Sequence, residues 1–194
     1  MPYYHGSPVA GIKTLAPPPG GVIYLTNCRA YALFYIRDLE VNHVTCGVAR
    51  DGVVEYDEQF PGQLRALYAG RGGWIYACEG DGFAQGHSPW IVTAGRAVDV
   101  VSAQYIPDAY ESIAREIDAG TVRFKRYEDK TDEQKRDITE MAAWAILKNG
   151  HLSAATPKAR FYEQSFPQAW ALVLENQARA GEYIAQWEKA HLQK

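Results

Sequence analysis

The sequence predicts an α+β protein, with a sheet-forming first part and a helical second part. Residues 1 to about 108 hold most of the glycines and most of the short runs of β-prone residues. From about residue 109 onward the chain is rich in Ala, Glu, Lys, Gln and Arg, which favour helices. Strands and helices do not alternate strictly, so a doubly wound parallel sheet is not expected. We therefore expect a β-rich domain over residues 1–108 and a helical extension over residues 109–194.

Seven short runs in the first part are expected to form strands, because they are rich in β-branched or aromatic residues and most are bounded by Gly, Pro, Asp or Asn. They cover residues 3–7, 22–26, 44–50, 53–60, 74–79, 90–93 and 97–106. Asp51-Gly52 lies between two of these runs and predicts a hairpin, since both central positions of a type I′ turn favour a positive φ.

Two short helices are expected among the strands and three longer ones after them. The predicted ranges are 28–37, 61–67, 109–119, 133–148 and 168–192. Asn27 and Asp108 are expected to cap the first and third of these, and Gly120 should end the third. Aromatic residues at helical spacing are usually core, so Trp144, Trp170 and Trp187 are expected to anchor helix packing.

The composition is that of an ordinary globular chain and excludes several function classes. The 194 residues are 47% apolar and 22% charged, with a net charge of -3, so the basic excess of a non-specific nucleic-acid binder is missing. The basic segment 123–127 is followed at once by acidic residues and is expected to be a solvated linker. No apolar run approaches the ~20 residues that span a bilayer, and we expect no membrane partner. The first residues lack the pattern of a signal peptide, which predicts a cytoplasmic protein.

Common catalytic and metal-binding motifs are not found in the sequence. Residues 70–73 (GRGG) lack the Lys and the following helix of a phosphate-binding loop, and neither GxSxG nor HExxH occurs. Cys28, Cys46 and Cys78 are not in CxxC pairs, so we expect reduced, buried thiols and no metal site.

The first 35 residues carry the pattern that points to a binding pocket. His5, Gly6 and Ser7 end the first predicted strand and offer hydrogen-bonding groups together with close access to the backbone. Tyr24 lies on the second predicted strand, and Tyr35 follows eleven residues later at the end of the next predicted helix. Two tyrosines supply flat faces on which a planar ring can stack. These residue types suit a nucleotide or nicotinamide ligand.

The same residues resemble the ADP-ribosyltransferase fold, in the branch of diphtheria toxin and the poly-ADP-ribose polymerases. Members of that branch carry His-Gly, often followed by Ser, on the first strand, a tyrosine on the next strand, and a second tyrosine about three helical turns later. Here His5-Gly6-Ser7, Tyr24 and Tyr35 occupy those positions. The resemblance covers about the first 40 residues and implies a split β-sheet core followed by a helical extension.

The resemblance implies NAD as the substrate and gives each residue a role. His5 would hydrogen-bond a ribose of NAD, and the Gly6 backbone would hold the amide of nicotinamide. Tyr24 and Tyr35 would sandwich the nicotinamide ring, and Ser7 would assist with the amide or a ribose.

The family's catalytic glutamate has no direct match. It commonly precedes an aromatic residue and Ile-Val, and the matching stretch here is Pro89-Trp90-Ile91-Val92, with proline at the glutamate position. Glu79, next to Gly80, is the preferred substitute for the catalytic carboxylate. The other polar candidates are Asp81, Glu55, Asp57, Glu58 and His87.

Four functions remain open at this point. The first is an NAD-dependent ADP-ribosyltransferase, toxin-like or phage-related and bacterial, that modifies a protein or nucleic-acid target. The second, suggested by Pro89, is an inactive module that binds NAD or ADP-ribose. The third is an RNA 2′-phosphotransferase, which shares the fold but needs several basic residues to hold phosphates, and no such set stands out here. The fourth is a structural or partner-binding protein that uses the helical part.

Overall fold

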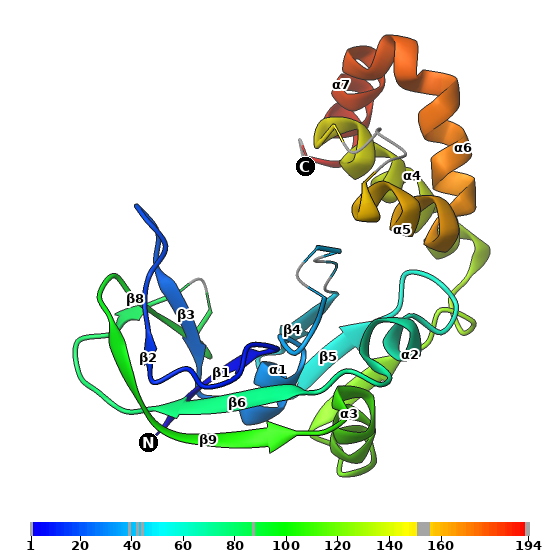
Figure 1. Ribbon diagram of the computed structural model, residues 1–194. Helices are drawn as coiled ribbons and strands as arrows, with labels where there is room; N and C mark the ends of the chain where they lie inside the picture. The colour runs from blue at the N-terminus through cyan, green and yellow to red at the C-terminus, as the bar shows by residue number, and fades with distance from the viewer. Residues whose placement is uncertain are drawn as a thin grey trace. The chain divides into compact units, whose positions relative to one another are not determined.

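The computed structural model describes residues 2–38, 40–41, 43, 45–86, 88–150 and 156–192. It is an α+β structure with an antiparallel sheet and carboxyl-terminal helices, which confirms the predicted class (Figure 1). The chain forms two compact units. The first unit comprises residues 1–38, 42–58 and 62–125, and the second comprises residues 39–41, 59–61 and 126–194. The boundary expected at residue 108 thus lies inside the first unit, because the helix and strand that follow it pack there.

A seven-stranded sheet dominates the first unit, in the order β2-β9-β6-β1-β3-β8-β7. Every neighbouring pair is antiparallel. The strands are β1 (Tyr3–Ser7), β2 (Thr14–Leu15), β3 (Ile23–Thr26), β6 (Gly73–Cys78), β7 (Ala84–Gln85), β8 (Ile91–Ala94) and β9 (Val98–Ile106). Five of them match predicted strands. Two-residue β2 and β7 were not predicted, because a strand that short shows no alternating pattern.

A second, three-stranded sheet consists of β4 (Cys46–Val48), β5 (Val54–Asp57) and β10 (Val122–Lys125). Gly52 has a φ of 84° in the turn between β4 and β5, as expected for the predicted hairpin. Residue 44, in the predicted strand 44–50, lies outside the described residues. The linker predicted over 123–127 is wrong for residues 123–125, which belong to β10. The first residue of β10, Val122, is buried. β10 pairs in parallel with β5, which is far away in the sequence, and the local charge pattern does not reveal such a pairing.

Three helices complete the first unit: α1 (Arg29–Leu33), α2 (Gln63–Tyr68) and α3 (Ala109–Asp118). Asp108 caps α3 as predicted, its side chain accepting a hydrogen bond from the Glu111 backbone N–H. The cap predicted at Asn27 is wrong. Cys28 holds the N-cap position of α1, and its N–H donates to the hydroxyl of Thr26 at 3.0 Å. The α-helix also ends earlier than predicted, and residues 34–36 continue it through i→i+3 hydrogen bonds.

A cluster of aromatic side chains packs the end of α1 against the smaller sheet. The rings of Phe34, Tyr56 and Tyr68 come from the end of α1, from β5 and from α2, and all three are fully buried. Their centroids lie 5.1 to 6.1 Å apart. Because Phe34 is held in this cluster, the backbone of the neighbouring Tyr35 is held as well.

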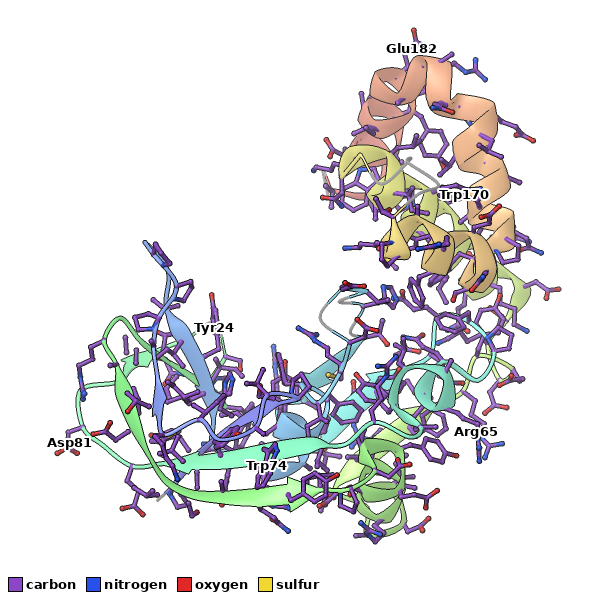
Figure 2. The ribbon with its side chains drawn as sticks, in the orientation of Figure 1. Tyr24, Arg65, Trp74, Asp81, Trp170 and Glu182 are labelled. Atoms are coloured by element: carbon purple, nitrogen blue, oxygen red, sulfur yellow. The ribbon has the colours of Figure 1, made fainter. Side chains whose placement is uncertain are left out.

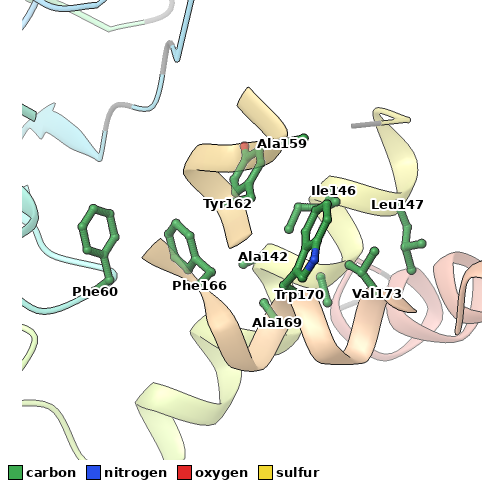
Figure 3. Close-up of a cluster of buried hydrophobic side chains, with 11 residues drawn as sticks. Phe60, Ala142, Ile146, Leu147, Ala159, Tyr162, Phe166, Ala169, Trp170 and Val173 are labelled. Carbon is green, nitrogen blue, oxygen red and sulfur yellow. The ribbon is translucent and has the colours of Figure 1, made fainter. Parts of the chain in front are cut away.

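The second unit is helical, with α4 (Asp132–Lys148), α5 (Pro157–Ser165), α6 (Pro167–Asn176), η1 (Gln177–Arg179) and α7 (Ala180–His191). The single helix predicted over 168–192 is wrong, because η1 separates α6 from α7. Both α6 and α7 contact α4. Trp170 is buried in the cluster shown in Figure 3, and the Trp144 and Trp187 rings stack 4.5 Å apart between α4 and α7.

Candidate functional site

The candidate site lies where two neighbouring strands of the large sheet separate. β1 pairs with β6 along its whole length, whereas it pairs with β3 at one position, Tyr4 opposite Thr26. β3 pairs instead with β8 over its full length. Beyond the shared pair, β1 and β3 therefore diverge, as Figure 1 shows. Because β1 and β3 diverge, the edges that they turn toward each other are unpaired, and a pocket opens between the two strands.

The pocket has a volume of about 280 Å³ and brings together residues from β1, β3, α1 and the segment before β3. Its polar groups come from Tyr4, His5, Gly6, Tyr24, Thr26, Tyr31 and Tyr35. Leu15, Ala16, Pro18, Val22, Ile23, Leu25, Ala32 and Ile91 supply apolar contacts. Four of the five predicted binding residues thus line one cavity. The exception is Ser7.

His5 is held in a defined tautomer. Its Nδ1 lies 3.2 Å from the carbonyl oxygen of Tyr24, across the gap between the two strands. A carbonyl can only accept, so Nδ1 carries the proton and donates it. Burial lowers the pKa of His5 below its ordinary value, which keeps the ring neutral at neutral pH. In the neutral ring Nε2 is an acceptor, and it can take a hydrogen bond from a ligand hydroxyl.

Gly6 lets β1 and α1 approach closely. A Cβ at this position would lie 1.8 Å from the carbonyl oxygen of Ala32 and 3.2 Å from the Cβ of Tyr35. Only glycine avoids that overlap. The resemblance implies a role of Gly6 toward the ligand, and the structure shows a packing role beside Ala32 and Tyr35.

Ser7 is used inside the fold. Its side chain is buried, and its hydroxyl accepts a hydrogen bond from the Val9 N–H at 3.1 Å. Ser7 is not among the described residues that line the pocket. The hydroxyl therefore stabilises the turn after β1, and the direct ligand contact expected for Ser7 finds no support in the geometry.

The two predicted tyrosines lie in different surroundings. Tyr24 is 54% exposed on β3 (Figure 2), while Tyr35 is half-buried after α1. The hydroxyl of Tyr35 donates to that of Tyr31 at 3.0 Å, and the guanidinium of Arg37 lies 5.0 Å from the centroid of the Tyr35 ring. Burial raises the pKa of both Tyr31 and Tyr35, so both remain protonated at neutral pH.

Tyr31 is a pocket residue that the sequence reasoning missed. It stands four residues before Tyr35, and residues at this spacing share one face of a helix. The ring centroids of the two tyrosines are 5.4 Å apart at an angle of 76°. The i, i+4 spacing was therefore the signal that could have added Tyr31 to the candidate residues.

The substitute catalytic carboxylate is not brought to the pocket. Among the described residues that line it, none is an Asp or Glu. Glu79 is exposed and follows β6 at the end where Cys78 pairs with Tyr3, before the pocket residues of β1 begin. Pro89 is also exposed and outside the pocket lining, whereas Ile91, two residues later, contributes to it.

The remaining polar candidates have other surroundings. Asp81 lies in the loop after β6, well apart from Tyr24 in Figure 2. Glu55 forms a salt bridge with Arg123 of β10. Glu58 is only 3% exposed, and its carboxylate accepts the Leu64 N–H at 2.9 Å near the start of α2. Asp57 ends β5, outside the described pocket lining. His87 lies outside the described residues.

Comparison of the chain with protein-family models, with curated proteins and with solved structures gives no match. Among the described residues, no cluster of three His, Cys, Asp or Glu side chains could hold a metal ion. In the same part of the chain, no helix has the length and apolar character needed to cross a membrane. The pocket is therefore the feature of the molecule that points to a function.

Proposed function

We propose that the pocket between β1 and β3 binds NAD or ADP-ribose, with the nicotinamide end of NAD in the cavity. The observation that carries the proposal is the convergence of His5, Gly6, Tyr24 and Tyr35, which the sequence separates by up to 30 residues, on one pocket. Its volume of about 280 Å³ is near the lower limit of small-molecule sites, roughly 300 Å³, so it suits one end of a dinucleotide.

The pocket chemistry is that expected for a planar ring joined to a sugar. Nε2 of His5 would accept a hydrogen bond from a ribose hydroxyl. The aromatic side chains of Tyr24 and Tyr35 would contact the ring, and apolar residues such as Ile91 would exclude water from it. Tyr31 would hold the Tyr35 hydroxyl and so orient the Tyr35 side chain.

Binding without turnover is the form of this function that the geometry favours. Cleavage of the nicotinamide–ribose bond builds positive charge on the ribose, and a nearby carboxylate would stabilise that charge. The pocket lining supplies none among the described residues. ADP-ribosyl transfer to a protein or nucleic-acid target is the second candidate, supported by the resemblance of residues 5–7, 24 and 35 to the transferases.

Titration calorimetry of NAD into the protein tests the binding proposal. Tyr24→Ala should weaken binding by about 1–3 kcal/mol, the usual effect of removing an aromatic stacking partner. Tyr105→Ala is the matched control, because Tyr105 is also a strand tyrosine with 54% exposure but is not in the pocket lining. Absence of NAD and ADP-ribose binding, or equal losses in both variants, would contradict the proposal.

Nicotinamide release separates the two candidates. Binding without release supports the inactive module. Release that disappears in Tyr35→Ala would establish cleavage of NAD in the pocket, and ADP-ribose found attached to a protein or nucleic acid rather than released to water would establish the transferase. Glu79→Gln would then show whether Glu79 supplies the carboxylate. Full activity of Glu79→Gln would exclude that role.

A further inference from the structure

The outer edge of β9 is unpaired over its second half. β9 pairs with β6 on its inner side from Val100 to Ile106. On its outer side β2 pairs with Val98 and Asp99, and the Val100 N–H donates to the Lys13 carbonyl at 2.9 Å. From Val101 to Tyr105, no further strand of the described chain lies beyond β9 (Figure 1). We call residues 101–105 the open edge.

One protective feature lies at the start of the open edge. The register between β6 and β9 shifts between Ala77 and Cys78, so Val101 has no partner residue on β6. The remaining residues of the edge carry no protective charge. Edge strands are normally very short or carry charged residues, because their unpaired N–H and C=O groups can bind another strand. The other edges in the described chain follow this rule: β2 and β7 have two residues each, β4 has three, and β10 carries Arg123 and Lys125. The open edge has five residues, Val-Ser-Ala-Gln-Tyr, and no charge.

The two faces of the open edge differ in polarity. Ala103 and Tyr105 share one face, where the Tyr105 ring packs 5.1 Å from the Trp74 ring. Val101 and Tyr105 remain 57% and 54% exposed. Ser102 and Gln104 lie on the other face, and the Gln104 side-chain oxygen accepts a hydrogen bond from Arg29 at 2.7 Å. The amide N–H groups of Gln104 can therefore still donate.

We propose that the open edge pairs antiparallel with the same edge of a second copy of this chain. A two-fold axis through the middle residue places Ala103 opposite the partner's Ala103. Ser102 faces the partner's Gln104, whose amide can donate to the serine hydroxyl. Apolar thus meets apolar on one face and polar meets polar on the other.

This pairing makes a second copy the occupant that the edge fits best. A segment that matches itself when reversed satisfies an isologous two-fold interface, the commonest symmetry of protein dimers. No like charges meet along the five residues, so the open edge itself does not repel a second copy. The two seven-stranded sheets would join into one continuous sheet. β9 is separated from β1 by β6, so the dimer contact does not use the pocket strands β1 and β3.

Charge substitutions at the two-fold axis test the proposal. Ala103 is exposed, so both Ala103→Lys and Ala103→Glu should fold. Each variant alone places like charges opposite each other and should raise the dimer dissociation constant by about tenfold or more. An equimolar mixture of the two should restore the dimer, because Lys then faces Glu. Ala66→Lys on α2, also at an exposed alanine of the first unit, should leave the wild-type dissociation constant unchanged.

Sedimentation over a range of concentrations gives the dissociation constant of each sample. The expected result is a concentration-dependent dimer of the wild type, loss in each Ala103 variant and recovery in the mixture. A wild type that remains monomeric would overturn the proposal. So would a dimer that Ala103→Lys leaves intact, or variants whose mixture does not recover. Recovery in the mixture also excludes misfolding as the cause of the loss.

Discussion

Replacement of Gly6 by alanine is the most direct test of how the pocket is built. The added Cβ would lie 1.8 Å from the Ala32 carbonyl oxygen, and real Cβ contacts are at least about 3.0 Å. β1 and α1 must therefore move apart by more than an ångström. The obstacle is backbone and cannot change rotamer, so we expect the upper end of overpacking costs, about 3 kcal/mol. For a chain of this length that corresponds to a Tm lower by roughly 6–12 °C.

Gly47→Ala provides the matched control. A Cβ at Gly47, on β4 of the same unit, would meet no atom within 4 Å, so its Tm should stay close to that of the wild type. Thermal unfolding followed by circular dichroism gives the two values. Hydrogen exchange should be faster in β1 and α1 of Gly6→Ala than in the wild type. That result would show that the loss of stability arises in the first unit and not in the second. A Gly6→Ala protein as stable as Gly47→Ala would refute the close approach of β1 and α1.

Two further predictions concern pH and helix capping. Below about pH 6.5 the unfolded chain protonates His5 while the folded chain does not, so stability should fall as the pH drops through that range. His5→Gln keeps a donor toward the Tyr24 carbonyl but cannot titrate, and urea unfolding at about pH 7.5 and about pH 5.5 should show a smaller loss; an unchanged loss would assign the effect to other groups. Thr131→Ala removes the capping box of α4, in which Thr131 and Gln134 exchange hydrogen bonds, and should cost about 1 kcal/mol. Thr139→Ala, which removes a bond within the same helix, should cost clearly less, and equal costs would contradict the capping role.

Local sequence patterns predicted those strands, turns and helix caps that depend on residues close together in the chain. β1 was predicted with its observed bounds, and Asp108 and the turn at Gly52 match the predicted cap and hairpin. These features depend on a few adjacent side chains and on backbone preferences that glycine and aspartate carry in any fold. Non-local features were missed for the opposite reason. β10 is a strand because it pairs with β5, more than sixty residues earlier. The break at η1 between α6 and α7, which both contact α4, is not marked by a proline in the sequence.

Part of the pocket lining was predicted. The sequence alone singled out four of its residues: a histidine and a glycine on one strand and two tyrosines at a defined spacing. It placed Ser7 among them because a hydroxyl beside His-Gly looks available, and it overlooked Tyr31, whose link to Tyr35 depends on the helix face.

Only the tertiary structure decided that these residues line a cavity and that the described lining of this cavity has no carboxylate. The divergence of β1 from β3 creates the cavity, because each strand follows a different neighbour beyond Tyr4 and Thr26. The same long-range pairing leaves Glu79 outside the pocket lining and leaves the edge of β9 open. Strand order arises from contacts between residues far apart in the chain, and for that reason neither feature can be obtained from local spacing.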